Sequence, residues 1–416
     1  MKSKHIATET FLFWLCAVGL YFMANLQKVV MPGAIWGELQ THFQTDAASV
    51  AHTGAVFMYA YAFSQLFVGL LIDKYSGLRV ITVGAMVLCV GSSLSAFAPS
   101  LSLLYVARVL VGLGAASVYL SITKETARLY SASFAQMMGL VMLGGYLGGV
   151  MGNAPFIYAV QTYGWQQTLH VTTLAVIAVY VIYCLLGLRQ AKPTILSGAS
   201  FDLKRFGEVM LVKQNWNIVI AGALPFALYF VLQSVIGKKF LEDYTKCTSE
   251  QAGWVMTLLM IIGALGSLAV PAVSARLGQR RCPLMRFSAI GTLLAFLCII
   301  GMIAAGFQSF LLAAATLVLL AVTGNISPVV VALVRESNRN DNWGVMLSLY
   351  TFLAYMATAL LGNALGWMLD RFEPLMFEGV VTYRCESYLV VFTMMALLSA
   401  ASVYSAYHLK EKKETL

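Results

Sequence analysis

The sequence has few charged residues for its length. Only 11% of its 416 residues are Asp, Glu, Lys or Arg, whereas a soluble globular protein usually has about 25%. Hydrophobic residues make up 60% of the chain, and in water such a chain would expose apolar surface that it could not cover. The composition therefore argues against a soluble protein and favours an integral membrane protein.

Sequence signatures of several other classes of protein are also missing. No Walker loop (Gly-x4-Gly-Lys-Ser/Thr) is present, which argues against a pump driven by ATP. The seven cysteines show no metal-ligand spacing, and no cluster of nucleophiles, acids or metal ligands indicates an enzyme. We therefore expect no catalytic residues, no cofactor, no metal and no enzymatic activity. Whether Cys247 and Cys385, which map to the same side of the membrane, form a disulfide stays open.

Long apolar runs predict twelve membrane-spanning helices, since a helix needs about 20 apolar residues to cross the hydrocarbon core. The runs cover residues 11–33, 50–72, 80–98, 101–122, 136–158, 168–188, 216–237, 253–274, 285–306, 310–331, 344–369 and 387–408. Strands of a membrane barrel would instead give segments of about 10 residues with alternating polarity, and the sequence lacks these. The runs predict an all-α membrane protein.

The basic residues are distributed unevenly between the two sides of the predicted helices. If the amino terminus is cytoplasmic, most of the 27 Lys and Arg residues fall on the cytoplasmic side. The other side has Lys238, Lys239, Lys246, Arg371 and Arg384, of which we expect Lys238 and Lys239 to anchor the outer surface. The asymmetry fits the positive-inside rule. It explains the net charge of +9 without a nucleic-acid partner, and it places both termini in the cytoplasm.

The two halves of the chain resemble each other. Leu26-Gln27 in the first predicted helix recurs as Leu232-Gln233 in the seventh, and Gly152-Asn153-Ala154 recurs as Gly362-Asn363-Ala364. Two six-helix repeats related by an axis along the membrane normal are a known transporter plan. We therefore expect six-helix bundles at residues 1–189 and 214–416, joined by a cytoplasmic linker at 190–213.

The loop after the second predicted helix carries a family signature. Gly69-Leu70-Leu71-Ile72-Asp73-Lys74, followed by Gly77 and Arg79, resembles the signature loop of the major facilitator superfamily, with one extra residue before the glycine. The run Arg108-Val109-Leu110-Val111-Gly112-Leu113-Gly114 resembles the helix-4 motif of that superfamily, and the glycine-rich stretch 144–155 is similar to its helix 5. The resemblance covers essentially the whole chain. It implies the major facilitator fold, with two pseudo-symmetric six-helix bundles and a solute path between them.

A narrower resemblance concerns the end of the first predicted helix. Leu26-Gln27-Lys28-Val29-Val30-Met31-Pro32 and the following helix look like bacterial permeases near the organic-anion and sugar-phosphate branch. In that branch a basic residue commonly occupies helix 1. This resemblance implies a place in the plasma membrane, here the bacterial inner membrane.

Lys28 is the sharpest candidate for a substrate-binding residue. A cation inside a spanning helix costs at least about 2.5 kcal/mol at mid-depth, so it usually faces a watery cavity or a partner. We interpret Lys28 as an anion-binding ammonium, and snorkelling to the outer interface is the alternative. Asn25 and Gln27 add hydrogen-bonding capacity beside it. Because no Asp or Glu lies near the middle of any predicted span, the cleft should be net positive and suit an anion.

Other polar residues are candidates with two readings each. Arg108 offers a planar donor fork that suits a carboxylate or phosphate, and a capping or interhelical bond is the alternative reading. Two roles stay open for each of the remaining candidates: lining the cavity, or forming a hydrogen bond between helices. These candidates are Tyr146, Gln233, Asn325 and Tyr350. For gating, we expect a cytoplasmic latch made of Asp73, Lys74, Arg79 and Arg128, with Arg276 in the second half, where Ala275 replaces the aspartate.

These features predict a secondary active transporter that moves a small organic anion across the cytoplasmic membrane by alternating access. A proton gradient or exchange would drive it, so it would be a symporter or an antiporter. Efflux of multidrug or amphipathic solutes by the same fold is the alternative, and a membrane sensor or membrane enzyme is a more distant one. The expected partners are a small, anionic substrate and the lipid bilayer, with the chain as a monomer.

Overall fold

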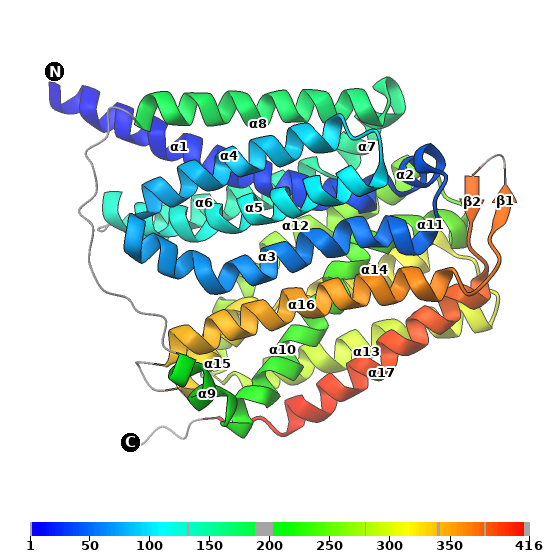
Figure 1. The fold of residues 1–416 in the computed structure, drawn as a ribbon. Coiled ribbons are helices and arrows are strands. Elements are labelled where there is room, and N and C mark those ends of the chain that lie inside the picture. The colour runs from blue at the N-terminus through cyan, green and yellow to red at the C-terminus, as the bar shows by residue number, and fades with distance from the viewer. Residues whose placement is uncertain are drawn as a thin grey trace. The chain divides into compact units, whose positions relative to one another are not determined.

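The described residues of the computed structural model are almost entirely helical (Figure 1). They comprise 2–130, 133–187, 203–278, 280–338, 342–377 and 380–411, without the side chains of 2–8, 70, 73, 135–136, 203–205, 268, 377 and 380. Contacts divide the chain into two compact units. One comprises Met1–Ile35 and Val56–Phe201, and the other comprises Trp36–Ala55 and Asp202–Leu416.

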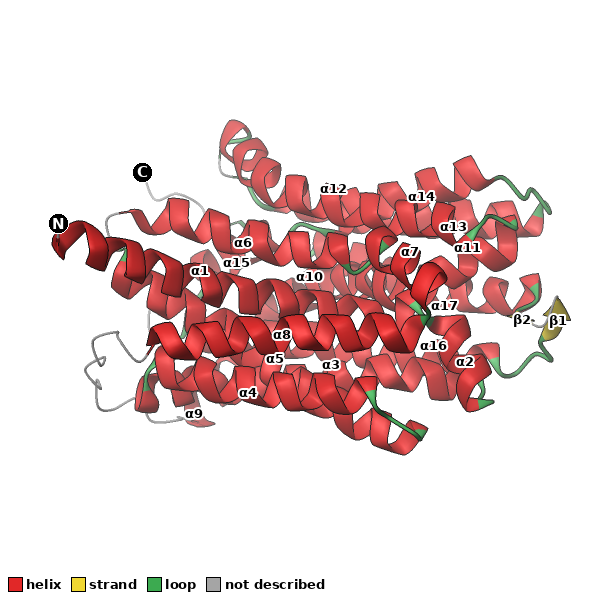
Figure 2. Cartoon of the chain, turned by 90° about the horizontal axis from the view of Figure 1, so that it is seen from above, coloured by secondary structure: helices red, strands yellow, loops and turns green. Residues whose placement is uncertain are grey.

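Long helices that lie along one another make up the first unit (Figure 2). Its elements are α1 (Lys2–Val29), η1 (Val30–Ala34), α4 (Gly77–Ala96), α5 (Leu101–Leu129), α6 (Phe134–Met151), α7 (Ala154–Tyr163) and α8 (Trp165–Gly187). Helix α3 (Ala47–Tyr75) begins in the second unit and belongs to the first unit from Val56 onward.

The second unit also begins with a short helix, α2 (Trp36–Phe43), and ends with α17 (Cys385–Tyr407). Between them come α9 (Leu203–Met210), α10 (Lys213–Val231), η3 (Leu232–Ile236), α11 (Gly237–Thr245), α12 (Ser249–Arg276), α13 (Cys282–Ala304), α14 (Phe310–Gly324), α15 (Ser327–Ser337), α16 (Trp343–Leu369), β1 (Leu375–Phe377) and β2 (Val380–Thr382).

The number of long apolar helices agrees with the membrane architecture expected from the sequence. Among the described residues, 10 helices are long and apolar enough to cross a membrane, and the bent pair Ser249–Ser267 and Ala269–Arg276 brings the number to 11. Helix α3, with 29 residues, occupies the remaining predicted span at residues 50–72. The expected all-α membrane fold is therefore confirmed.

Several predicted spans have a proline at or near a break in the described helices, a feature that the apolar runs do not reveal. Pro32 lies in η1 directly after α1, and Pro225 lies inside α10 before η3. Pro155 and Pro328 lie in the first turns of α7 and α15, which share one candidate span each with α6 and α14. Proline has no N–H and its ring clashes with the preceding turn, so it bends or breaks a helix.

The hairpin β1–β2 is absent from the sequence prediction. It pairs Leu375 with Thr382 and Phe377 with Val380 in antiparallel register. Each strand has only 3 residues, which is too short for an alternating pattern to be recognised.

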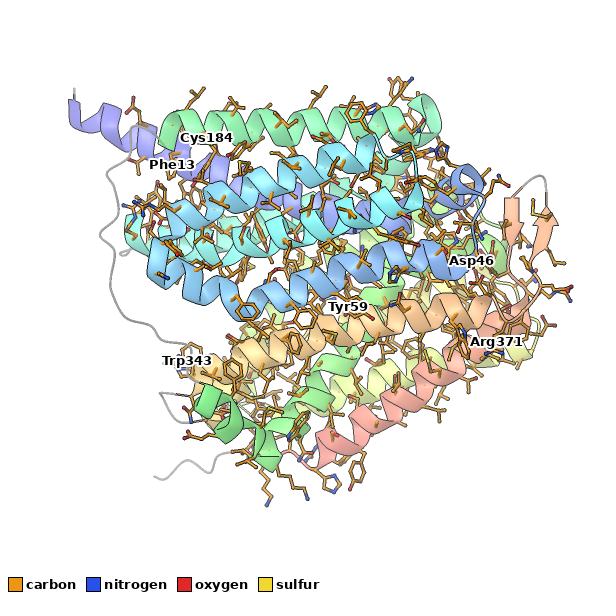
Figure 3. The ribbon with its side chains drawn as sticks, in the orientation of Figure 1. Phe13, Asp46, Tyr59, Cys184, Trp343 and Arg371 are labelled. Atoms are coloured by element: carbon orange, nitrogen blue, oxygen red, sulfur yellow. The ribbon has the colours of Figure 1, made fainter. Side chains whose placement is uncertain are left out.

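Glycines allow the helices of the first unit to pack closely. A Cβ added to Gly91 of α4 would lie 2.6 Å from the backbone nitrogen of Val111 in α5, and one on Gly148 of α6 would lie 2.1 Å from a carbonyl oxygen of α1. Any larger residue would push these helices apart. In the core beside them, the ring of Phe13 stacks on Tyr183 at 4.8 Å. Phe13 of α1 and Cys184 of α8, both labelled in Figure 3, belong to this core.

Candidate functional site

Helix α1 ends at a break, where backbone carbonyls lack the hydrogen-bond donors of a regular helix. Met31 has extended backbone angles (φ −129°, ψ 124°), and Pro32 has no N–H to donate to the turn before it. Backbone carbonyls at this point therefore lack their usual helical donors. Inside a membrane each such carbonyl must find a donor within the protein.

Arg108 of α5 supplies those donors. Its two terminal nitrogens donate to the carbonyl oxygens of Gln27 and Met31, each at 2.8 Å. The side chain is 1% exposed, and its guanidinium lies 4.6 Å from the centre of the Phe57 ring. This planar fork suits two adjacent oxygens better than a point charge would. The geometry is that of an interhelical bond, which was one of the two readings of Arg108.

Lys28 lies at the same break. Its side chain is 8% exposed, and its Nζ atom lies 5.2 Å from the centre of the Tyr61 ring in α3. An ammonium over an aromatic face is attracted by the ring quadrupole, by about 2 kcal/mol when desolvated. Lys28 is therefore buried against α3 within the first unit, and its role in binding an anion stays a prediction.

Two amides flank Lys28 and differ in their bonding. The side-chain nitrogen of Asn25 donates to the carbonyl of Tyr21 in the preceding turn, at 2.9 Å. Gln27 is 2% exposed, and within the described residues its side-chain nitrogen has no hydrogen-bond partner. A buried polar atom without a partner is uncommon and calls for an explanation such as a ligand.

The second unit has a matching break at η3. Gln233 lies in this π-helical segment, is 2% exposed, and among the described residues neither its side-chain oxygen nor its nitrogen has a partner. The Leu-Gln pair repeated in the sequence therefore lies at or just before an irregular helical segment in each unit. In both units the glutamine offers unsatisfied hydrogen-bonding capacity.

The remaining candidate residues lie on several helices. Asn325 caps α14 and donates to the carbonyl of Ala321 at 2.9 Å. Tyr350 of α16 is 6% exposed and packs in the core of the second unit. Tyr146 of α6 is half-buried. The structure thus gives Asn325 a bond within its own helix and places Tyr350 in the core.

An aromatic cluster in the second unit was missed from the sequence. The rings of Phe226 and Phe230 stack at 5.6 Å on α10, and Tyr355 of α16 meets Phe226 edge-on at 5.5 Å. The i, i+4 spacing of the two phenylalanines was the available signal. It was overlooked because aromatic residues are frequent throughout this chain.

Arg128, one residue of the expected latch, pairs with an acidic residue that was not among the candidates. Arg128 forms an ion pair with Glu125 at 2.7 Å. Glu125 is 4% exposed and also accepts the backbone N–H of Leu78 at 3.1 Å, at the start of α4, where a negative charge is favourable. Lys74 and Arg79 are exposed, and the side chain of Asp73 lies outside the described part of the structure.

The corresponding place in the second unit uses different residues. Arg276 is exposed in the last turn of α12. Arg281, five residues later, forms an ion pair with Glu336 of α15 at 2.9 Å and also donates to the hydroxyl of Ser274. In each unit, the acid that pairs with the arginine lies near the C-terminal end of a helix: Glu336 in α15 and Glu125 in α5.

A carboxylate also caps the start of α3. The two oxygens of Asp370, which follows α16, accept the backbone N–H groups of Ala47 at 2.9 Å and Ala48 at 2.7 Å. His52 Nδ1 lies 3.0 Å from Asn363 Oδ1 one turn further along. Burial raises the pKa of Asp370 above its usual range, and the two backbone donors act in the opposite direction.

Lys238 and Lys239 correct an expectation. They were expected to anchor the surface, but they are 5% and 3% exposed. Lys239 pairs with Asp243 at 2.6 Å, and Asp243 also accepts the hydroxyl of Tyr388 at 2.8 Å and the backbone N–H of Tyr383 at 3.0 Å. The ion pair explains the burial, since a buried charge needs a partner and further hydrogen bonds.

Among the described residues, the cysteines form no disulfide and the possible metal ligands form no metal site. Cys247 and Cys385 are both free thiols, and burial raises the pKa of Cys247. No group of three or more His, Cys, Asp and Glu side chains that could hold a metal was found in the described ranges.

Long apolar helices in two units, with buried polar residues beside their breaks, define the class of integral membrane transporters. The sequence profile of the Major Facilitator Superfamily matches residues 13–243, more than half of the chain. The chain therefore belongs to the Major Facilitator Superfamily. Its family and fold are those of secondary transporters, which work by alternating access.

Solved transporter structures share this fold over nearly the whole chain. A bacterial homologue of the human lysosomal transporter Spinster, in an inward-facing and unoccupied conformation, matches with a TM-score of 0.77 at 15% identity, covering 96% of this chain and 98% of that chain. The nucleoside transporter NupG matches with a TM-score of 0.74 at 14% identity, covering 95% and 100%. The peptide transporter POT in complex with sulfate matches with a TM-score of 0.77 at 12% identity, covering 96% and 93%. No curated protein sequence matches significantly.

Proposed function

We propose that this transporter moves a small organic anion across the bacterial inner membrane, by proton-coupled symport or by exchange. The observation that carries the proposal is the burial of Lys28 at the break of a membrane-spanning helix, beside the unsatisfied amide of Gln27. The proposal includes a monomer with both termini in the cytoplasm. It also includes six-helix bundles at 1–189 and 214–416 with a linker at 190–213, of which 190–202 lies outside the described residues.

The charge of the site supports an anion over a cation. Lys28 and Arg108 bring two buried cations to one helix break. A carboxylate or phosphate placed there recovers part of the free energy that burial of the ammonium costs. A cationic solute would meet repulsion from both groups in a medium of low dielectric constant.

The amides support a solute with several hydrogen-bonding groups. Gln27 and Gln233 each hold polar atoms without partners in the described residues. A solute bound at the first break and carrying hydroxyl or carboxylate groups would satisfy the amide of Gln27, and such pairing discriminates strongly against solutes that lack those groups. Small carboxylates and sugar phosphates combine both properties.

Uptake into proteoliposomes tests the proposal. The assay uses a panel of labelled monocarboxylates, dicarboxylates and sugar phosphates, with an imposed pH gradient or with preloaded substrate. For the best substrate, Lys28→Ala should cost about 2 kcal/mol or more of binding free energy, which raises KM about 30-fold. Lys28→Arg keeps the charge and should retain part of the activity.

Lys213→Ala is the matched control, because Lys213 is exposed at the start of α10. It should leave uptake unchanged. Wild-type kinetics for Lys28→Ala would reject the lysine as the anion site.

Efflux of amphipathic solutes remains the second candidate, and the aromatic cluster of Phe226, Phe230 and Tyr355 favours it. Apolar aromatic walls suit large, weakly polar solutes. Transport of neutral or cationic amphiphiles that is insensitive to Lys28→Ala would support efflux and contradict the anion proposal.

A further inference from the structure

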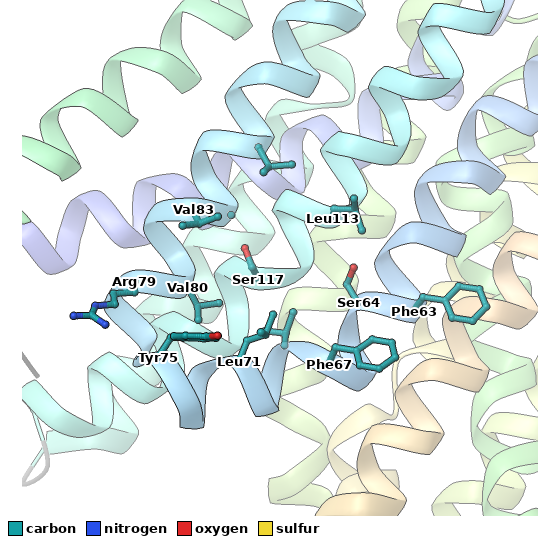
Figure 4. A pocket seen from close by; sticks show the side chains of 13 residues that line it. Phe63, Ser64, Phe67, Leu71, Tyr75, Arg79, Val80, Val83, Leu113 and Ser117 are labelled. Carbon is teal, nitrogen blue, oxygen red and sulfur yellow. The ribbon is translucent and has the colours of Figure 1, made fainter. Parts of the chain in front are cut away.

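A large apolar groove lies on the first unit between α3, α4 and α5 (Figure 4). Its volume is about 780 Å³. Its walls include Phe63, Phe67 and Leu71 of α3, Val83 of α4 and Leu113 of α5. These side chains are between 40% and 58% exposed, so the groove belongs to the surface of the unit and not to its core.

The groove offers a ligand almost no hydrogen bonds. Away from Tyr75 and Arg79 at one end, its polar side chains are Ser64 and Ser117, and each donates to a carbonyl of its own helix, Ala60 and Gly114 respectively, at 2.7 Å. A solute site normally combines apolar walls with a few polar groups that fix orientation. The bonding of these two serines leaves this groove suited to plain hydrocarbon.

Water is a poor occupant of such a space, because a water molecule needs two or more polar partners. Left empty, the walls would forfeit dispersion contacts. From Phe63 to Tyr75, helix α3 rises about 18 Å. One leaflet of the hydrocarbon core is about 15 Å thick, half of the whole core. The groove therefore matches the length of one lipid chain in one leaflet.

Positive charge lies at one end of the groove. Arg79 lines it beside Tyr75, and Lys74 lies over the Tyr75 ring at 5.2 Å. Both basic side chains are exposed. The nearby start of α4 is already occupied by a carboxylate, because Glu125 accepts the N–H of Leu78 and pairs with Arg128. Among the side chains that the structure describes at this end, Lys74 and Arg79 are the cations that line or flank the groove.

We propose that this groove binds one acyl chain of an anionic phospholipid, with the headgroup phosphate held by Lys74 and Arg79. Hydrocarbon packing alone gives little preference, since the bilayer interior is equally apolar. Selectivity for the lipid comes from the two cations, each contributing about fivefold to the preference for an anionic headgroup. The proposal is independent of the transported solute.

Native mass spectrometry of the purified full chain in detergent tests the proposal. Phosphatidylglycerol and phosphatidylcholine with identical acyl chains are titrated in parallel, and the tightest lipid adduct is counted. The wild type should prefer phosphatidylglycerol. Lys74→Gln and Arg79→Gln should each lower that preference about fivefold. Val83→Trp should fill the groove and abolish the tight adduct of both lipids.

Matched controls separate the groove from the rest of the surface. Leu174→Trp places the same ring on α8, where Leu174 is 66% exposed and outside the groove. Lys213→Gln removes an exposed charge from the second unit. Both should bind lipid as the wild type does, and a melting curve confirms that every variant is folded.

Three results would overturn the proposal. They are equal affinity for the two lipids in the wild type, an unchanged preference in both glutamine variants, and a tight adduct that survives Val83→Trp. Displacement of the adduct by a neutral amphiphile as readily as by phosphatidylglycerol would also overturn it, because the groove would then accept any apolar solute.

Discussion

The helix breaks at the end of α1 and at η3 carry the same Leu-Gln pair but differ at the next residue. Lys28 follows Gln27 in the first unit, whereas Ser234 follows Gln233 in the second. Lys28 is buried against the Tyr61 ring, while the hydroxyl of Ser234 donates to the carbonyl of Phe230 in its own helix at 2.6 Å. The first break is therefore charged, and the second is neutral at the matching position.

The buried cations of the two units also differ in what they contact. In the second unit, Lys238 pairs with Glu242 at 3.2 Å and Lys239 with Asp243 at 2.6 Å. In the first unit, Arg108 donates to backbone carbonyls, and Lys28 lies over an aromatic ring. An acid brings a full negative charge to the cation beside it, whereas a backbone carbonyl or an aromatic ring brings only a partial one. This contrast is why substrate charge should depend chiefly on the first unit.

Arg108→Met should have the largest effect, because it removes the donors that the first break requires. Two buried carbonyl oxygens would lose their partners, at about 1–3 kcal/mol each, so we expect a loss of about 4 kcal/mol in the free energy of unfolding. Denaturation in detergent, followed by intrinsic fluorescence, measures this loss. Arg108→Lys is the control, since it keeps the charge but not the fork. Wild-type stability of both variants would mean that the break does not depend on Arg108.

Asp243→Asn should cost somewhat less, about 3 kcal/mol, because it leaves Lys239 buried without its counter-charge. The same denaturation assay reports the loss. The double variant Lys239→Met/Asp243→Leu replaces the pair by apolar groups and should recover most of the stability. If the double variant were as unstable as the single one, the pair would matter for its packing and not for its charge.

Gln233→Met should have the opposite sign. Within the described residues the buried amide has no partner, and an apolar side chain of similar size removes that cost, so we expect a gain of about 1.5 kcal/mol. A variant that is less stable than the wild type would indicate that Gln233 is satisfied in the protein without any solute.

The fold could be predicted from the sequence because the bilayer demands long apolar helices, and such runs are visible without tertiary information. The breaks could not be placed in the same way. Pro32 and Pro225 are visible in the sequence, but whether a proline bends a helix gently or interrupts it depends on which neighbour supplies the missing donor. At the break beside Pro32, Arg108, 76 residues away in the chain, donates to the carbonyls of Gln27 and Met31.

The sequence predicted the residues of the candidate site but not how they contact one another. Lys28, Gln27 and Arg108 were recognisable because polar residues are rare inside membrane helices. Their mutual geometry was not recognisable, since the guanidinium fork fits a substrate carboxylate and a pair of carbonyls equally well. Glu125 and Asp370 were overlooked because both lie at helix ends, where acids are usually solvated, and only the structure reveals the N–H groups they accept.

The helix caps formed by Glu125 and Asp370 lead to the smallest change in the free energy of unfolding that we predict. Glu125 accepts one N–H at the start of α4 and is held by Arg128, whereas Asp370 accepts two N–H groups at the start of α3. A charged cap at a helix N-terminus contributes about 1 kcal/mol. Asp370→Asn keeps one acceptor and removes the charge, so the free energy of unfolding should fall by about 1 kcal/mol, with faster hydrogen exchange confined to the first turn of α3. Asp46→Asn is the control, because Asp46 accepts the backbone N–H of Ser49 in the same helix, at 2.8 Å. If the two variants exchanged alike, the contact from α16 would add nothing to the local cap.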